Sequence, residues 1–584
     1  MKLSWDLSQI YATQQDYLSD KQKLKELGNK LVLFKGKLNN KKDLLNYFVV
    51  NEEFSKIEEK LVSYLFFTKS LDGSNIFAIE ELSELEIYLQ ELNNKTVFIS
   101  QELKKIPNKS LQEFAKLPEF KDYDLDLLDI IKDKKHTLPE SQEKLMIGAS
   151  FANNNSELFD CLNNVEIKYG KTIDEQGKIV TLNKSNSRVL TSSHIKKVRL
   201  YAYVRILRAY KAVNQTIASN YISHLKYSNF VAKTYKYKNT LDLCLNDADL
   251  PNNLPQSVVK NVTNYLPLLH SYYAWRKQFM GLKHIDSNDL SCNLFDRTVN
   301  KEYTLQEGVS IIKEALQVLG PDYINLLDKA IENKWIDSEF APNKESGAYS
   351  SSLYGVHPFI LLTYDKTQDS VSTLAHELGH AMHSYYSEKA QPYAKHNYEI
   401  FVAEVASTVN EVLLANYFIN NAKNNKEKIA FITDFLNTFV ATVFTQTQYT
   451  EFELFAHNAV DKGEPLSYKK LNDCYLQLQK KYCGKNVLIV SDSQYHWSRV
   501  PHFYRSFYVF KYATGFISAC AIAQKLLTDK NYLPKYKEFL SAGGSKKPCD
   551  ILKLADVDIL DSKTYKQAFK LFDNYLNILK NTKE

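Results

Sequence analysis

Residues 373–384, TLAHELGHAMHS, place two histidines four positions apart, with a glutamate directly after the first. On an α-helix, His376 and His380 lie one turn apart on the same face. At that spacing two imidazoles can reach one zinc ion, while Glu377 lies beside the open coordination position and can act as a general base. The motif predicts a catalytic metal site, and a third ligand must come from elsewhere in the chain.

The third ligand separates the classes of zinc peptidase that share this motif. Metzincins have a glycine three residues after the second motif histidine and a histidine six residues after it. This chain has His383 and Tyr386 at those positions, which excludes that class. Two glutamates remain as candidates, Glu399 and Glu404.

The helical pattern of residues 398–418, YEIFVAEVASTVNEVLLANYF, distinguishes the two glutamates. Glu399 has the spacing of gluzincin aminopeptidases, but the GAMEN-type loop with which those enzymes bind a free α-amine is absent from the sequence. Glu399 also lies at the expected helix start, where a carboxylate is common. Glu404 lies in an apolar stripe, where a carboxylate is costly unless it is paired or metal-bound. We therefore predict Glu404 as the third ligand, with Glu411 seven residues later on nearly the same face.

The helix that carries the motif is expected to begin at a cap residue, Asp369 or Ser370. His383 falls on the same face as the two motif histidines. We expect it to pack, or to hydrogen bond behind the ligands, rather than to ligate the metal.

The rest of the chain reads as mostly helical, because glycine (17) and proline (14) are sparse in 584 residues. Residues 80–106, 197–235 and 426–460 show apolar positions at helical spacing. Residues 165–182 alternate around a turn signal and predict a small hairpin. Residues 347–364 predict a strand just before the motif helix. Eight of the 13 histidines lie between His357 and His502, so the chemistry is expected in the C-terminal half.

Composition indicates an ordinary soluble protein, with 44% hydrophobic and 24% charged residues. A net charge of +6 is too small for this length to indicate a nucleic-acid or membrane partner, so neither is predicted. Seven scattered cysteines without a CxxC pair predict a reducing compartment, and hence a cytoplasmic protein. No signal peptide is expected from MKLSWDLSQIY. The uncharged run 512–523 is too short to span a bilayer and predicts a buried core helix.

HELGHAMHS, followed at this distance by FVAEVAST, resembles the thimet-oligopeptidase family of zinc peptidases, and within it the bacterial oligoendopeptidase F branch. The resemblance extends from Trp5 to about Asp558. Its motifs are specific in the C-terminal half and loose in the first 190 residues. The segments that carry it, in order, are WDLSQIY (5–11), LGPDYINLLDKAIENKWIDS (319–338), KESGAYSS (344–351), HFYRSFYVFKYATG (502–515) and FLSAGGSKKP (539–548).

The resemblance implies a mainly α fold: a large, bowl- or clam-shaped helical zinc metallopeptidase with a small β element beside the active-site helix. It also implies three regions along the chain. These are an N-terminal helical region (1–110), an oligoendopeptidase F-type N-terminal domain with the hairpin (111–190) and a catalytic zinc-peptidase domain (191–584).

The implied activity is zinc-dependent hydrolysis of internal bonds in short, unstructured peptides, with one Zn²⁺ per chain. By the match, the zinc ligands are His376, His380 and Glu404, and the general base is Glu377. The resemblance places substrate backbone along a strand formed by Gly347, Ala348 and Tyr349.

The same resemblance assigns a cluster that faces the scissile carbonyl, made of His502, Tyr508 and Tyr512. Tyr504 is a rival for this place, because several tyrosines crowd the segment. Which tyrosine would stabilise the oxyanion stays open.

Other functions remain as alternatives. The resemblance implies that the zinc lies in a deep channel. An exopeptidase of the same architecture differs only in which end of that channel is blocked, and the sequence offers little to separate the two. A binding protein with structural zinc would need a fourth ligand, from His383 or Glu399. Nucleic-acid binding ranks last, since no basic stripe is present. The cleavage preference, the physiological peptide and the oligomeric state stay open.

Overall fold

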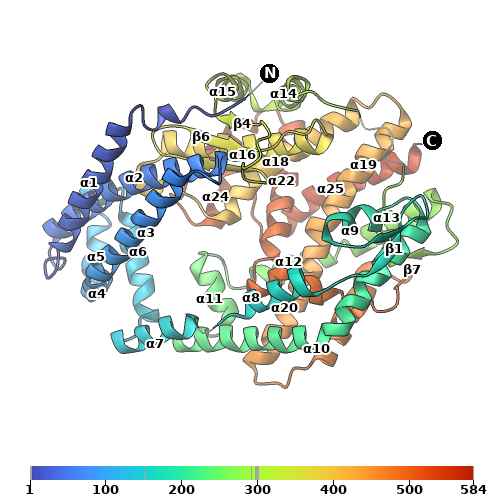
Figure 1. The fold of residues 1–584 in the computed structure, drawn as a ribbon, viewed down its shortest axis with the longest axis horizontal. Helices are drawn as coiled ribbons and strands as arrows, with labels where there is room; N and C mark the ends of the chain where they lie inside the picture. The colour runs from blue at the N-terminus through green and yellow to red at the C-terminus, as the bar shows by residue number, and fades with distance from the viewer. Residues whose placement is uncertain (1–2, 152, 291, 296–300, 583–584) are drawn as a thin grey trace. The chain divides into compact units, whose positions relative to one another are not determined.

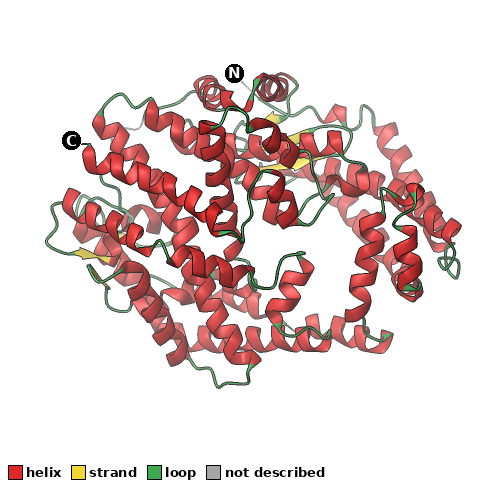
Figure 2. Cartoon of the chain, turned by 180° about the vertical axis from the view of Figure 1, so that it is seen from behind, coloured by secondary structure: helices red, strands yellow, loops and turns green. Residues whose placement is uncertain are grey.

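The computed structural model describes residues 3–151, 153–290, 292–295 and 301–582, and these are mostly helical (Figure 2). The predicted mainly α class is therefore confirmed. The chain divides into two compact units, each made of three separate segments. Unit 1 comprises Met1–Thr137, Lys301–Leu414 and Lys525–Asp556, and unit 2 comprises Leu138–Asn300, Ala415–Gln524 and Val557–Glu584. The three regions predicted along the chain, 1–110, 111–190 and 191–584, stay a prediction.

Unit 1 begins with a group of N-terminal helices, drawn in blue and cyan in Figure 1. The first starts at Thr13, whose side chain and that of Asp16 cap each other's backbone N–H groups. The helices of this unit are α1 (Gln14–Val32), α2 (Lys41–Leu71), α3 (Ile76–Thr96), α4 (Phe98–Lys105), α5 (Asn108–Phe114), α6 (Asp124–Asp133), α14 (Leu305–Ala315), α15 (Pro321–Glu332), α16 (Gln368–Ala390), α17 (Tyr393–His396), α23 (Leu533–Leu540) and α24 (Pro548–Leu554). The helix predicted over 80–106 is thus divided in two at Val97.

A three-stranded sheet of unit 1 precedes the motif helix, as predicted. Its strands are β4 (Ile336–Asp337), β5 (Tyr349–Ser352) and β6 (Pro358–Leu361). The central strand β6 runs parallel to β4 and antiparallel to β5, and all four of its residues are buried. β5 is half-buried and is an edge strand, since β6 is its only partner among the described strands.

Helix α16 packs against β5 and β6 (Figure 1). Its cap is Thr367, whose hydroxyl accepts the N–H of Ser370, so the predicted caps Asp369 and Ser370 are wrong. The sequence offered several capping residues in a row, and Thr367 is the one whose backbone is extended. Helix α18 (Ile400–Asn420) follows and ends beyond Leu414, in unit 2.

Unit 2 is built around the long helix α10, and its core includes Ile206, Tyr221 and Phe452. Its helices are α7 (Glu140–Phe151), α8 (Asn155–Cys161), α9 (Lys184–Thr191), α10 (Lys196–Thr234), α11 (Thr240–Asp247), α12 (Leu254–Thr263), α13 (Leu266–Phe279), α19 (Asn425–Phe439), α20 (Gln446–Asp461), α21 (Tyr468–Cys483), α22 (Phe510–Thr528, which ends in unit 1) and α25 (Ser562–Asn581).

Shorter elements complete the two units. The predicted hairpin is confirmed: β1 (Lys171–Ile173) and β2 (Ile179–Thr181) pair antiparallel, and Asp174 accepts two backbone N–H groups of the turn. β3 (Ile285–Asp286) and β7 (Val487–Leu488) pair in parallel. The 3₁₀ and π turns are Leu7–Gln9, Pro118–Phe120, Lys134–His136, Leu162–Glu166 (π), Ser287–Asp289, Gln317–Leu319, Val440–Thr445 (π), Ser493–Arg499 and Pro501–Tyr504.

Among the described residues, one helical run, Asn425–Asp461, is long and apolar enough to cross a membrane by length and composition. The core helices of soluble proteins pass the same test. This run is interrupted by the π turn at 440–445, and Glu453 and His457 are buried within unit 2. It therefore gives little support for a membrane span. The predicted core helix over 512–523 is confirmed within α22.

Candidate metal centre

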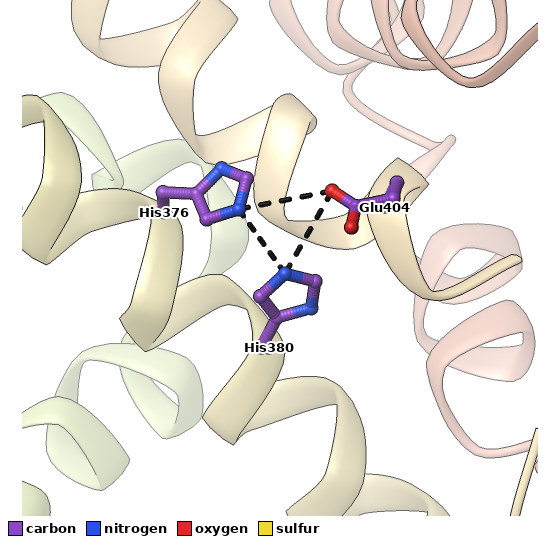
Figure 3. Close-up of side chains that lie close together, drawn as sticks. All are labelled: His376, His380 and Glu404. Carbon is purple, nitrogen blue, oxygen red and sulfur yellow. Dashed lines mark hydrogen bonds and ion pairs between the residues drawn. The ribbon is translucent and has the colours of Figure 1, made fainter. Parts of the chain in front are cut away.

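Helices α16 and α18 bring together the three predicted ligands (Figure 3). The Nε2 atoms of His376 and His380 are 3.1 Å apart. The Oε2 atom of Glu404 lies 3.7 Å from Nε2 of His376 and 3.8 Å from Nε2 of His380. Three donor atoms from two neighbouring helices therefore converge on one point.

The donor set fits zinc. Zinc prefers imidazole nitrogen and carboxylate oxygen in a tetrahedron, with bonds of about 2.0–2.2 Å. The edges of such a tetrahedron are about 3.3–3.5 Å long, by the same bond lengths. The three measured edges, 3.1, 3.7 and 3.8 Å, bracket that value. Three protein ligands leave the fourth position open, which is typical of catalytic rather than structural zinc.

Glu411 holds His376, the first of the predicted ligands, in place. Its Oε1 accepts a hydrogen bond from Nδ1 of His376, so the lone pair of Nε2 is left for the metal. Burial alone would lower the pKa of His376, but the hydrogen bond and the charge of Glu411 outweigh it and raise the pKa to about 8. The sequence placed Glu411 on the face of Glu404 but gave it no role. The seven-residue spacing was the signal that could have found it.

Glu377 is buried, with a relative exposure of 6%, between the two ligand histidines in sequence. Burial raises the pKa of Glu377 to about 7, and the carboxyls of Glu404 and Glu411 act in the same direction. A bound cation would oppose this shift by favouring the carboxylate. The environment is thus one in which a carboxyl group can both take and release a proton near neutral pH.

Gly379 allows α16 and α18 to approach closely. A Cβ at this position would lie 2.5 Å from the Cα of Ser407 on α18. Beside it, the Asn410 side chain donates to the carbonyl of Ala375 and accepts from Tyr323. These contacts fix the spacing of the two helices that carry the three donors.

The two rejected ligands lie away from the centre. The His383 ring is fully buried and stacks on Tyr398, with centroids 3.8 Å apart, and on Phe539 at 5.3 Å. Of the two expectations for His383, packing is thus the one observed. Glu399 is exposed just before α18, where its carbonyl accepts the first helical N–H groups.

Of the three residues predicted to pair with substrate, Gly347 and Ala348 lie just before β5 and Tyr349 is its first residue, all in unit 1. Gly347 is exposed and has a φ of +101°, which only glycine adopts readily. Ala348 follows, and Tyr349 begins the strand. The Tyr349 ring packs against Trp5 and Phe66, so this residue offers backbone rather than side chain to a ligand.

His502, Tyr508 and Tyr512 form a cluster in unit 2. Nε2 of His502 lies 3.1 Å from the Tyr512 hydroxyl, and the His502 and Tyr508 rings are parallel, with centroids 6.1 Å apart. The guanidinium of Arg505 lies over the Tyr508 ring at 4.0 Å. Burial, and then Arg505, lower the pKa of His502, which favours a neutral imidazole.

Tyr504 is turned away from this cluster. Its hydroxyl accepts a hydrogen bond from Asn220 at 3.1 Å, and its ring packs against Phe159 and His224. The structure therefore groups three of the four predicted C-terminal residues. Spacing alone could not separate Tyr504 from its neighbours, because a 3₁₀ turn over 501–504 sets its direction.

A mainly helical fold with an HExxH helix, and with a glutamate from the next long helix at the same centre, is the arrangement of a zinc metallopeptidase. Comparison with known proteins agrees. The family model "Peptidase family M3" matches residues 189–571, and the model "Oligopeptidase F" matches residues 102–169. The chain belongs to peptidase family M3.

The relatives agree over nearly the whole chain. It is 34% identical to oligopeptidase PepF of Bacillus subtilis, over 98% of this chain and 86% of that one. It is 32% identical to an oligoendopeptidase F homolog of Lactococcus lactis, over 99% and 97%. Two crystal structures are similar in fold. A protein from Chlamydophila abortus has a TM-score of 0.93 at 29% identity (99% and 98% covered), and the oligoendopeptidase-F of Enterococcus faecium has 0.72 at 27% (97% and 98%).

The predicted family and its oligoendopeptidase F branch are therefore confirmed. The activity class is confirmed with them: the chain is a metallo-oligopeptidase that cleaves internal peptide bonds.

Proposed function

We propose that this chain hydrolyses internal bonds of short, unstructured peptides at a single zinc ion held by His376, His380 and Glu404. The observation that carries the proposal is the convergence of the three donor atoms, with edges of 3.1, 3.7 and 3.8 Å. Zinc is the metal that this ligand set favours, although other divalent ions fit imidazole and carboxylate ligands.

When bound there, zinc would polarise the peptide carbonyl and lower the pKa of an attacking water toward neutrality. Glu377 then acts as general base, because its buried carboxyl lies beside the first ligand in the chain. It takes the proton of the water and delivers it to the leaving amine. Glu411 keeps His376 in the tautomer that presents Nε2.

The substrate backbone pairs with the free edge of β5, beginning at Gly347, Ala348 and Tyr349. An edge strand offers N–H and C=O groups that no other described strand uses. Backbone pairing of this kind binds a peptide without selecting most of its side chains. This supports a broad range of oligopeptide substrates.

His502, Tyr508 and Tyr512 supply hydrogen-bond donors for the oxyanion that develops on the scissile carbonyl. Their mutual contacts within unit 2 support a common role. Loss of one such donor typically costs about 10²–10³ in rate. Tyr504 is the weaker candidate, because its hydroxyl is engaged by Asn220.

The alternatives have less support. A structural zinc site needs a fourth ligand, and the metal-binding group found among the described residues has three members. An exopeptidase of the same fold has no observation in its favour. The charge of +6 supports no nucleic-acid or membrane partner. The scattered cysteines, with no CxxC pair in the sequence, support a reducing, cytoplasmic location.

The test is mass spectrometry of the products from a ten-residue peptide blocked at both ends, incubated with zinc-loaded protein. We expect internal cuts, because neither blocked terminus offers a charge for an exopeptidase to recognise. The same peptide with free termini is tested in parallel. If only this unblocked peptide is cleaved, the result favours the exopeptidase. If neither peptide is cut while zinc is bound, the metal is structural and the proposal is wrong.

A further inference from the structure

Glu453 is a fully buried carboxyl in the middle of α20, far along the chain from the metal ligands. A carboxyl group inside a protein core is costly unless it is well partnered. Its Oε1 accepts one hydrogen bond, from the backbone N–H of Phe507 at 3.0 Å. Burial raises the pKa of Glu453 well above its usual range, which favours the neutral acid over the carboxylate. A buried carboxyl with a single hydrogen bond costs stability, which suggests that the residue has a specific role.

The N–H that Glu453 accepts belongs to a residue with an unfavourable backbone conformation. Phe507 has a φ of +55°, a left-handed conformation that is uncommon for a bulky residue. Its side chain is buried, with a relative exposure of 3%, and its ring packs on the ring of His457, one turn after Glu453 on α20. Strained backbone persists where the surroundings hold it. Here α20 holds both the N–H and the ring of Phe507.

A second helix holds the residue before it. The hydroxyl of Ser506 lies 3.2 Å from Nε2 of His224, which is buried on α10. Buried side chains of α10 and α20, two helices of unit 2, thus hold two consecutive residues of one turn.

This turn joins the members of the C-terminal cluster. The N–H of Arg505 donates to the carbonyl of His502 at 2.9 Å, and the N–H of Tyr508 donates to the carbonyl of Arg505 at 3.2 Å. The chain from His502 to Tyr508 is therefore a compact double turn, with Phe507 at the point where it reverses. A change in the φ of Phe507 would re-aim Tyr508 directly.

We propose that Glu453 is a positioning residue for the peptidase reaction: by accepting the N–H of Phe507, it fixes the left-handed turn that orients Tyr508 relative to His502. This inference rests on the proposed role of the His502–Tyr508–Tyr512 cluster. Glu453 itself lies in the core and touches no reacting atom.

Two variants of nearly equal size test the acceptor. Glu453→Gln keeps an oxygen that can accept the Phe507 N–H, while Glu453→Met fills the same space without one. We expect kcat on an internally quenched peptide to fall roughly 10- to 100-fold for Glu453→Met at nearly unchanged KM, as is typical of misplaced catalytic groups. We expect Glu453→Gln to stay within about threefold of wild type, since the hydrogen bond is kept.

Thr447→Val is the matched control. Thr447 is also fully buried on α20, but its hydroxyl donates to the carbonyl of Val443 in the preceding π turn and not to the turn at 502–508. We expect its kcat to be unchanged. Equal losses for the Gln and Met variants, or an unchanged kcat for Glu453→Met, would overturn the proposal.

Hydrogen exchange gives a readout that does not depend on activity. We expect faster exchange over residues 499–512 in Glu453→Met than in wild type or Glu453→Gln; the same exchange in all three contradicts the proposal. If the Met variant does not fold, the wild-type amide of Phe507 decides, and free exchange there overturns it. If His502→Ala and Tyr508→Phe leave kcat unchanged, the catalytic role of the cluster fails, while the exchange result still tests the hold on the turn.

Discussion

The carboxylates of Glu404 and Glu411 approach different nitrogens of the same imidazole, that of His376. Both lie on α18 two turns apart, and the first faces Nε2 of His376 while the second binds Nδ1. A histidine held at Nδ1 by a carboxylate is a better metal ligand. Loss of that carboxylate commonly weakens metal binding about 10- to 100-fold. One helix therefore supplies both a proposed ligand and the group that orients another.

The first prediction concerns the general base. In Glu377→Gln the ligand histidines are untouched, so we expect the variant to bind zinc as wild type does. The amide cannot accept the proton, and kcat should fall by about 10²–10⁴, the usual contribution of general base catalysis. Zinc content and single-turnover cleavage, measured on the same preparation, check this. Turnover close to wild type would remove Glu377 from the role of base.

The second prediction separates the two candidate third ligands. We expect Glu404→Ala to lose zinc or to bind it far more weakly, because one of three donors is removed. Glu399→Ala is the matched control, five residues earlier and exposed, and we expect its affinity to be unchanged. Competitive titration with a chromophoric chelator measures both. The reverse order of affinities would make Glu399 the ligand.

At this scale the sequence predicts residues whose chemistry depends on spacing along one helix. His376, Glu377 and His380 are recognisable for that reason. It did not reveal the stacking of His383 on Phe539, since these residues meet only through tertiary packing. Both ring nitrogens of His383 are buried without a hydrogen-bond partner in the described part of the chain. No pattern in the sequence distinguishes such a histidine from a hydrogen-bonded one.

Among the elements, α16 links the metal centre to the edge strand. Its Glu388 accepts a hydrogen bond from the hydroxyl of Ser352, the last residue of β5. Burial raises the pKa of Glu388 to about 7; the Ser352 bond opposes this shift, and the charge of Glu59 on α2 adds to it. One hydrogen bond to a partly buried carboxyl thus joins the helix to the strand.

The third prediction follows from this shift. A carboxyl whose pKa is raised from 4.5 to about 7 in the folded state stabilises the fold fully below pH 4.5, and this contribution is lost as pH rises through 7. Glu388→Gln has no such proton. We expect the free energy of unfolding of the variant to gain on that of wild type between pH 5 and pH 8. Urea unfolding at four pH values measures the free energy of unfolding of both proteins. If the difference between wild type and variant is the same at every pH, the prediction is wrong.

Element boundaries were harder to predict than element types. Residues 426–460 form a continuous helical run, but a π turn over 440–445 shifts the faces of α19 and α20 relative to one another. Val97 ends one helix and starts the next while keeping a helical backbone. Apolar periodicity does not show such local changes, because they exchange one hydrogen-bond pattern for another without altering composition.

For the whole molecule, family resemblance predicted the fold class and order of motifs, but not the division into two units. Each unit gathers three distant segments, and a linear reading of composition contains no such information. All three proposed zinc ligands lie in unit 1, and the cluster of His502, Tyr508 and Tyr512 lies in unit 2. Metal binding should therefore stabilise one unit first.

The fourth prediction tests this at the scale of the molecule. Zinc at 100 times its dissociation constant would stabilise the folded state by about 2.7 kcal/mol. We expect a chelator to lower the Tm of wild type and to increase hydrogen exchange mainly over residues 368–414. The Glu404→Ala variant, without the full ligand set, should show no further shift. A chelator effect of equal size in that variant would contradict the assignment of the site.

The segmented construction also has a consequence for synthesis. The first part of unit 1 ends at Thr137, but its last part begins only at Lys525, about 390 residues later. At the ribosome's usual pace of about 5–20 residues per second, that interval lasts roughly 20–80 s. Within that interval α16 is complete at Ala390, but Phe539, one of the two aromatic rings that pack on His383, follows about 150 residues later, roughly 7–30 s at the same pace. The helix with the proposed metal-binding histidines therefore remains incompletely covered until almost the whole chain has been made.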